Sequence, residues 1–334
     1  MKLTVAFQTD KPLSAYGPLA ATAEALGFDG VSIYNDMLYQ PAWLPLYEIA
    51  RHTRRVRIGP AAVNPFTCHP VQIAGQIALI DEASEGRAYL GMARGSWLDF
   101  VGIEPRRPVR ALSEAIRCVQ HLLSGSTQPL PGEIFPLAGG DTLRWPIRRP
   151  DIPIMLGSWG AQTIQACAGM IAEVKIGGTA NPDVVPHMRR LLDDAAAAHG
   201  RPHEKIELVV GSVTVVDEDR SAARALARRE VALYLPVVAA LDPTVQIEPD
   251  RMARIRQAAE RYDFDAAAAL ISDDILTRFA LAGTPDDVAG QAIALAQAGA
   301  DRVEFGTPHG LDETHGLRLL GERVLPLVRE AVGS

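Results

Sequence analysis

Short runs of aliphatic and β-branched residues alternate along this chain with longer segments in which apolar residues recur every three or four positions. The longer segments predict amphipathic helices at 18–26, 71–83, 109–123, 161–168 and 287–298. The short runs predict eight strands, at 3–8, 30–34, 56–63, 88–93, 152–156, 173–176, 206–216 and 302–305. Alternation of this kind indicates a parallel sheet, and eight units favour an α/β fold closed into a (β/α)₈ TIM barrel over an open doubly wound sheet.

Two segments are longer than such units need. Residues 124–151 are rich in Pro and Gly and lack periodicity, so we expect a long loop with a small hairpin near 142–145. Residues 219–279 are helical in pattern, rich in Ala and Arg, and exceed one crossover. We therefore expect a single barrel domain, 1–334, with both insertions at its carboxyl-terminal face. There they would cover a substrate or, alternatively, support a dimer interface.

Composition narrows the class of protein. The net charge is −7, and no Lys/Arg cluster is interleaved with aromatic residues, which argues against nucleic acid as a partner. No apolar run is long enough to span a membrane, and the first ten residues lack a signal-peptide pattern. Cys68, Cys118 and Cys167 are isolated, and no histidine has a metal partner at ligand spacing. We expect a reduced, cytoplasmic protein without a metal site.

The segment 59–70 carries the most specific local signal. It begins as an apolar strand and turns through a polar elbow into a helix. Because Pro65 and Pro70 keep their predecessors out of helical geometry, the side chain of Asn64 is held at the end of the strand. His69 either caps the following helix or contacts a bound cofactor. In a barrel, such strand ends build the active site.

Glycines at three further strand ends point to the same face. Gly95 follows the fourth strand and lets the backbone approach a ligand, while Arg94 beside it supplies a positive charge. Gly157, Ser158, Trp159 and Gly160 precede a predicted helix, an arrangement typical of an anion site. After the sixth strand, the chain repeats the pattern with Gly178 and Thr179.

These motifs identify a resemblance. The chain is similar to the luciferase-like flavin/F420 superfamily, and most closely to the coenzyme F420-dependent 5,10-methylenetetrahydromethanopterin reductases. The resemblance runs from residue 1 to about 330 and rests on the Asn-Pro-Phe-Thr elbow at 64–67 and on the runs 79–91, 152–157, 283–287 and 319–322.

The resemblance implies a cofactor site and a substrate pocket. It places a non-prolyl cis peptide at Ala61-Ala62, forming a bulge behind the cofactor ring. The elbow, Arg94 and Gly95 would lie beside the cofactor, and its phosphate-bearing tail would lie at 157–160 and 178–179. The substrate pocket would include Phe7, Asn35, Trp97 and the loops 124–151 and 234–250.

Three positions depart from the reductase pattern. Ala6 stands where the reductases have a carboxylate proposed to assist proton transfer, Asn35-Asp36 replaces an Asp-His pair, and Glu173-Val174 replaces Asp-Gly. The catalytic group must then come from elsewhere. Asp36 and Gln8 are the candidates by strand position.

We therefore expect an oxidoreductase that transfers a hydride between coenzyme F420 and a small-molecule substrate, either 5,10-methylenetetrahydromethanopterin or a related pterin. One alternative is FMN in the same pocket, either in a methylene-pterin reductase or in a luciferase-like monooxygenase. A second is a non-catalytic cofactor-binding or partner subunit. The resemblance also implies a homodimer or homotetramer.

Overall fold

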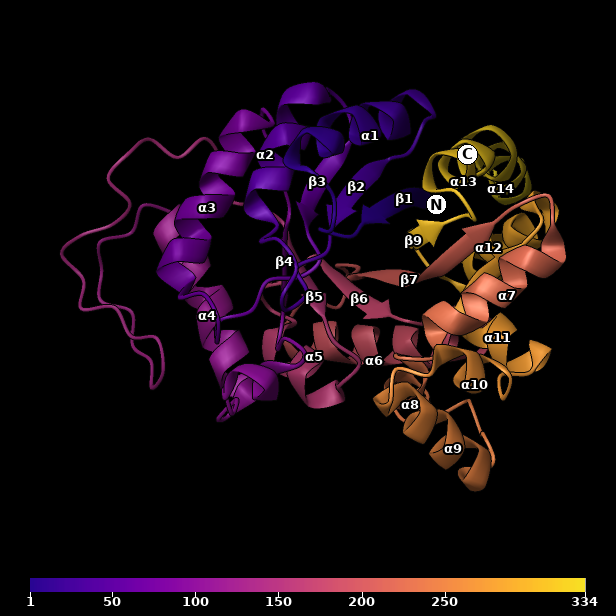
Figure 1. Ribbon diagram of the computed structural model, residues 1–334. Helices are drawn as coiled ribbons and strands as arrows, with labels where there is room; N and C mark the ends of the chain where they lie inside the picture. The colour runs from indigo at the N-terminus through magenta and orange to yellow at the C-terminus, as the bar shows by residue number, and fades with distance from the viewer. Residues whose placement is uncertain (334) are drawn as a thin grey trace.

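The computed structural model describes residues 1–333 and confirms the predicted TIM barrel (Figure 1). Eight parallel strands follow the order β3-β2-β1-β9-β7-β6-β5-β4. Isolated bridges from Ile58 to Ala88 and from Val63 to Met92 join β3 to β4 and complete the circle. The barrel strands are β1 (Lys2–Phe7), β2 (Gly30–Ile33), β3 (Arg57–Pro60), β4 (Leu90–Ala93), β5 (Ile154–Gly157), β6 (Glu173–Gly177), β7 (Glu207–Val216) and β9 (Arg302–His309).

Helices cover the outside of the barrel, and their apolar faces pack on the outward-facing strand residues in one continuous core. They are α1 (Leu13–Ala25), α2 (Trp43–His52), α3 (Pro70–Ala83), α4 (Pro108–Leu123), α5 (Ala161–Cys167), α6 (Val185–Ala198), α12 (Pro285–Ala298), α13 (Glu313–Leu319) and α14 (Leu325–Val332). Short 3₁₀ turns η1 (Leu98–Val101) and η2 (Pro182–Val184) and a π turn η3 (Leu320–Val324) complete this layer. Among residues 1–333, no helix is both long and apolar enough to cross a membrane.

One strand was not predicted from the sequence. Strand β8 (Ala280–Gly283) pairs only with the carboxyl-terminal half of β7, from Val213 to Val216, and so lies off the circular path. Its four residues directly follow a helical segment, and a run this short has no periodicity of its own. The long β7 therefore serves both the barrel and this outer extension.

The second insertion is helical, as predicted, and has a small apolar core of its own. It follows the carboxyl-terminal end of β7, and Figure 1 shows its middle helices projecting at the lower right. Its helices are α7 (Arg220–Val231), α8 (Leu235–Val238), α9 (Pro249–Glu260), α10 (Phe264–Ala268) and α11 (Asp273–Phe279).

The first insertion lies elsewhere than expected. Residues 124–151 connect α4 to β5, so they leave and rejoin the barrel at the amino-terminal side, and they run along the outside of α3 and α4 (Figure 1, left). The Glu114 carboxylate on α4 accepts hydrogen bonds from the backbone N–H groups of residues 133–135. The isolated antiparallel bridge joins Leu130 to Leu137, not residues near 142–145. The expected position of this loop over the strand ends is therefore wrong.

Candidate active site

A cavity of about 900 Å³ opens where the barrel strands end. It is lined by residues within or just after β1 to β7, by Thr307 of β9, and by Tyr234, Val237, Val238 and Leu241 of the helical insertion. The carboxyl-terminal strand ends are where barrel enzymes place their chemistry. Of the two loops expected in the pocket, 234–250 contributes residues in and around α8 to the lining, and 124–151 contributes none.

Small residues form much of the cavity floor. The Ala61-Ala62 peptide is cis, and Ala61 N–H donates to the Ile33 carbonyl at 2.8 Å. A Cβ on Gly157 would lie 3.2 Å from the Ala93 Cβ and 4.0 Å from the Ala62 Cβ. Gly157 therefore keeps these neighbouring strand ends free of protruding side chains, and Gly177 and Gly211 extend the same lining.

The elbow is held by Asn64. Its side-chain oxygen accepts hydrogen bonds from Phe66 N–H at 3.0 Å, from Thr67 N–H at 2.9 Å and from the Thr67 hydroxyl at 3.2 Å. Gly95, with φ +88°, lies against the amide, because a Cβ there would be 2.9 Å from the Asn64 Cγ. Asn64 lines the cavity, but its acceptor oxygen serves the turn.

Gln8 and Asp36 meet at the rim of the cavity. Gln8 Nε2 donates to Asp36 Oδ2 at 2.9 Å, and Thr9 N–H donates to Gln8 Oε1 at 2.9 Å, which fixes the orientation of the amide. Burial raises the pKa of Asp36, although the Gln8 hydrogen bond and the Lys175 charge act in the opposite direction. A carboxyl group with a raised pKa in a cavity is a candidate proton donor.

Aromatic side chains form the opposite wall. The Trp97 and Tyr234 rings meet edge to face, with centroids 5.9 Å apart. Both line the cavity, as do Arg94 and Asn35. The Asn35 side-chain oxygen accepts from Ala42 N–H at 3.1 Å, so this residue also orders the segment before α2.

The structure brings most of the predicted glycine-rich segment to the cavity. Gly157, Ser158, Trp159 and Gly178 line it. The Ser158 hydroxyl accepts from Gly160 N–H at 3.1 Å, and Trp159 Nε1 donates to the Gly177 carbonyl at 3.2 Å. One donor of the predicted anion site is therefore already engaged, and the helix behind it, α5, has only 7 residues.

Four predicted site residues lie outside the cavity. Phe7 faces the helices, with its ring edge to face on His309 at 5.4 Å, because side chains alternate along β1 and its neighbours Ala6 and Gln8 face the other way. His69 caps α3, accepting from Val71 N–H at 3.2 Å. Gly160 is the N-cap of α5. Thr179 is buried, and its hydroxyl donates to the Arg278 carbonyl at 3.2 Å.

A charged pair that was not predicted from the sequence lies at the base of the cavity. Lys175 on β6 lines the cavity and pairs with the fully buried Glu304 on β9. The ring of Tyr34, which also lines the cavity, lies 5.1 Å from the ammonium group, and desolvation raises the pKa of its hydroxyl well above the ordinary value. The available signal was the presence of two ionisable residues within predicted strands of a parallel sheet, whose residues are usually apolar.

The ligand-type side chains that lie together in residues 1–333 are Asp217, Glu218 and His315. Glu218 and His315 are exposed and share a 2.8 Å contact, and none of the three lines the cavity.

Comparison with known proteins gives matches over most of the chain. The luciferase-like monooxygenase family matches residues 3–302. A 5,10-methylenetetrahydromethanopterin reductase of Archaeoglobus fulgidus is 28% identical, covering 98% of this chain and 100% of the relative. The solved coenzyme F420-dependent tetrahydromethanopterin reductase of Methanopyrus kandleri superposes with a TM-score of 0.87 at 24% identity, covering 97% of this chain and 98% of that one.

A monooxygenase from Streptomyces bottropensis shares the fold, with a TM-score of 0.71 at 24% identity, over 98% of this chain and 99% of that chain. The predicted resemblance is therefore confirmed, and the non-catalytic alternative is set aside. Because the family model matches most of its length, this chain belongs to the luciferase-like monooxygenase family and is an enzyme.

Proposed function

We propose that this enzyme transfers a hydride between coenzyme F420 and 5,10-methylenetetrahydromethanopterin or a related pterin. The observation that carries the proposal is the juxtaposition, in one cavity, of a floor of Ala and Gly residues with the carboxyl group of the partly buried Asp36. Similarity to the Archaeoglobus reductase over nearly the whole chain supports the choice of cofactor and substrate.

The residues present fit a planar tricyclic ring. Ala61, Ala62 and Gly157 leave a shallow surface on one side, and the Trp97–Tyr234 pair supplies an apolar wall. Arg94 at the rim provides a positive charge for the anionic tail, and Gly178, with φ +80°, brings the backbone close to it. We assign Ala61, Ala62, Gly157, Arg94 and Gly178 to the cofactor site, and Asn35 and Trp97 to the substrate side.

When bound, the deazaflavin supplies the hydride. Burial raises the pKa of the Asp36 carboxyl group and so favours its neutral form, the form that acts as a proton donor. Gln8 keeps that carboxyl group in place through its 2.9 Å hydrogen bond. We propose that the hydride adds to the methylene carbon of the substrate, that the bond from this carbon to one of its two nitrogens breaks, and that Asp36 protonates the nitrogen that takes the electron pair. The aromatic wall excludes water from this step.

A second candidate uses FMN in the same cavity, as a methylene-pterin reductase or a luciferase-like monooxygenase. The observation in its favour is Ala6, a fully buried methyl group where the reductases have a carboxylate. Without that group, the catalytic arrangement differs from that of the F420 enzymes it resembles.

Titration of the purified protein with F420 and with FMN separates the candidates. We expect F420 to bind, and its reduced form to be reoxidised under anaerobic conditions by methylenetetrahydromethanopterin. Binding of FMN alone, with reoxidation that requires oxygen, would favour the monooxygenase. We also propose that the protein is cytoplasmic and forms a homodimer or homotetramer. Light scattering, which measures the molar mass in solution, tests the oligomeric state.

A further inference from the structure

Lys175 and Glu304 form an ion pair inside the barrel. Lys175 is 9% exposed and Glu304 is fully buried. Lys175 Nζ donates to Glu304 Oε1, and the Ser32 hydroxyl donates to Oε2. Burial acts to raise the pKa of Glu304, but the charges of Lys175 and Arg302 lower it overall, so this group stays ionised.

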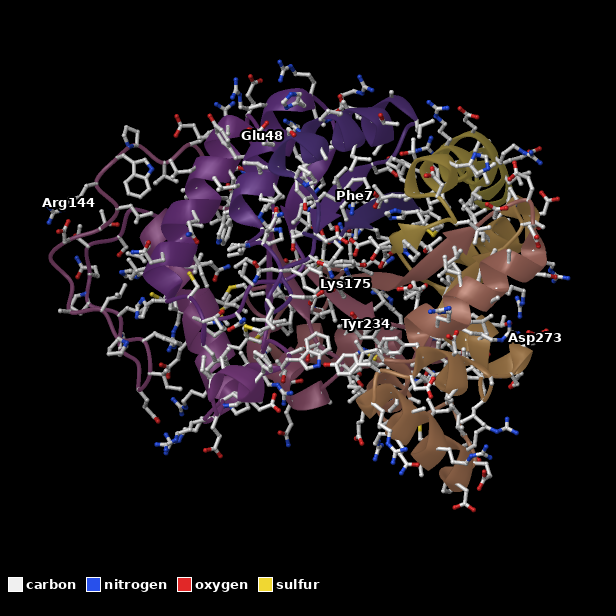
Figure 2. All side chains as sticks on the ribbon, in the orientation of Figure 1. Phe7, Glu48, Arg144, Lys175, Tyr234 and Asp273 are labelled. Carbon is white, nitrogen blue, oxygen red and sulfur yellow. The ribbon has the colours of Figure 1, made fainter. Side chains whose placement is uncertain are left out.

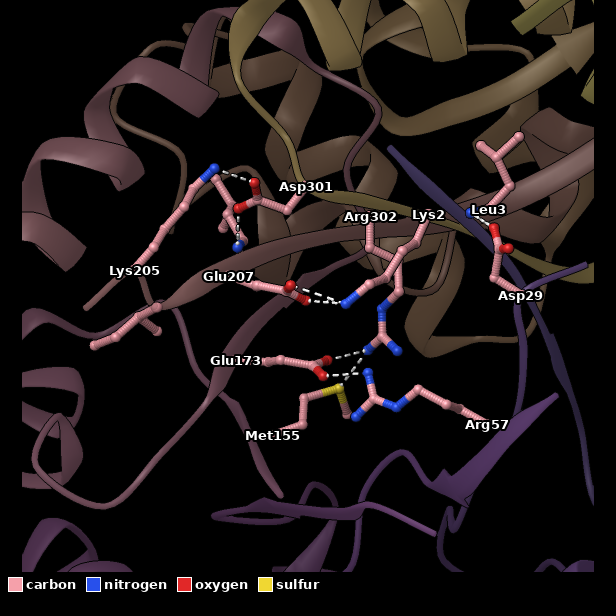
Figure 3. A network of polar contacts seen from close by, with 12 residues as sticks. Lys2, Leu3, Asp29, Arg57, Met155, Glu173, Lys205, Glu207, Asp301 and Arg302 are labelled. Atoms are coloured by element: carbon pink, nitrogen blue, oxygen red, sulfur yellow. Dashed lines mark hydrogen bonds and ion pairs between the residues drawn. The ribbon is translucent and has the colours of Figure 1, made fainter. Parts of the chain in front are cut away.

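The charges around this pair do not cancel. Below it, Glu173 lies between two arginines, 2.6 Å from Arg57 and 2.8 Å from Arg302 (Figure 3). The cluster of buried Lys175, Arg302, Glu173 and Glu304, together with the partly exposed Arg57, therefore holds three cations and two carboxylates. Among the described residues, Asp36 is another acidic group that lines the cavity, but it forms no direct ion pair with this cluster, and its side chain is engaged by Gln8.

Lys175 is the member of the cluster that reaches the cavity. Figure 2 shows it at the centre of the barrel, and it lines the cavity, whereas Arg57 and Arg302 lie against the Tyr89 ring. A lysine ammonium has three N–H donors, and the hydrogen bond to Glu304 uses one of them. The remaining N–H donors of Lys175 and the excess positive charge of the cluster are therefore available to a molecule bound in the cavity.

The register places this ammonium group beside the cofactor floor. Lys175 on β6 pairs with Gly157 on β5, and a Cβ on Gly157 would touch Ala93 and lie 4.0 Å from the Ala62 Cβ. Strands lie about 4.8 Å apart, so the Lys175 backbone stands one strand spacing from Gly157, and its side chain extends from there toward Gly211 on β7 and Glu304 on β9. A Cβ on Gly211 would lie 2.9 Å from the Lys175 Cε, so that glycine leaves room for the lysine stem.

We propose that Lys175 contacts the electron-rich edge of the cofactor ring and binds the reduced cofactor more tightly than the oxidised one. This inference rests on the proposed function. Reduction by two electrons increases the negative charge on the pyrimidinedione part of such a ring, and a nearby protein cation stabilises that charge. Glu304 is a positioning residue, since it holds Lys175 in its rotamer.

The test measures dissociation constants of oxidised and reduced F420, and of FMN, for the wild type and for Lys175→Met under anaerobic conditions. Lys175→Met leaves Glu304 buried without its partner, so Lys175→Met/Glu304→Gln, which removes both charges, is measured as well. Lys175→Arg keeps the charge. Lys205→Met is the matched control, because Lys205 is a surface lysine outside the cavity.

We expect both neutral variants to bind the reduced cofactor about 10- to 100-fold more weakly, the range for a hydrogen bond to a charged group, and the oxidised cofactor almost unchanged. The midpoint potential of the bound cofactor then falls by about 30 mV for each tenfold change. Lys175→Arg and Lys205→Met should keep the wild-type ratio. Equal losses in both redox states, or none, would overturn this inference alone, whereas a wild type that binds neither cofactor would overturn the proposed function with it.

Discussion

Replacing Asn64 with Ala tests whether the elbow depends on one side-chain oxygen. That oxygen accepts hydrogen bonds from Phe66 N–H, Thr67 N–H and the Thr67 hydroxyl, between 2.9 and 3.2 Å long. A single such bond contributes about 0.5–1.5 kcal/mol. Thr67 is exposed, so water replaces part of what is lost there. We therefore expect Asn64→Ala to cost about 1–3 kcal/mol of local stability.

Hydrogen exchange in the native state measures this cost where it arises. We expect the protection of the elbow amides to fall by about 5- to 150-fold in Asn64→Ala, the factor that corresponds to that free energy. Asn64→Asp keeps an acceptor oxygen and should retain most of the protection. Unchanged protection in Asn64→Ala, or an equal loss in Asn64→Asp, would refute the assignment of Asn64 as the residue that holds the turn.

Three further predictions concern the cavity and its surroundings. Asp36→Asn should slow hydride transfer by about 10²- to 10⁴-fold in single-turnover kinetics. Because burial raises the pKa of Asp36, the ionised carboxylate destabilises the folded protein, so the substitution should increase the free energy of unfolding at pH 8 and leave it unchanged at pH 3. Unfolding curves that show the reverse would contradict this. Gly157→Val should abolish cofactor binding while circular dichroism stays unchanged, since its side chain would enter the floor beside Ala93; wild-type affinity would disprove the placement. Burial opposes the charge of Glu114, but backbone N–H groups of residues 133–135 lower its pKa to about 2. The stability that the ionised Glu114 carboxylate contributes is therefore present above its ordinary pKa and is lost as the pH falls toward about 2. Glu114→Gln should make the segment 124–151 more susceptible to limited proteolysis at pH 7. Equal cleavage of wild type and variant would count against this role of Glu114.

The barrel could be predicted because its signal is local and repeated. Each apolar run between amphipathic helices specifies one strand, and parallel strands all end at the same face. Strand β8 gave no such signal, because it is four residues long and its pairing with β7 is a tertiary contact. The chain order also shows why 124–151 was misplaced, since a segment between α4 and β5 joins the barrel at the opposite end from the cavity.

The candidate site was predictable at the level of strand ends, not of single side chains. Gly157 ends β5 and Asn64 lies shortly after β3, and both line the cavity. Phe7 does not, because a strand alternates its faces and the position of one residue decides inside from outside. Lys175 and Glu304 lie 129 positions apart in sequence, and only the closed barrel shows that they form a pair.

Anaerobic mixing of the protein loaded with reduced F420 and 5,10-methylenetetrahydromethanopterin tests the central proposal most directly. We predict that the deazaflavin absorption of the oxidised cofactor returns without oxygen, at a rate that depends on Asp36. A protein that takes up neither F420 nor FMN, or a bound reduced cofactor that reacts only with oxygen, would contradict it.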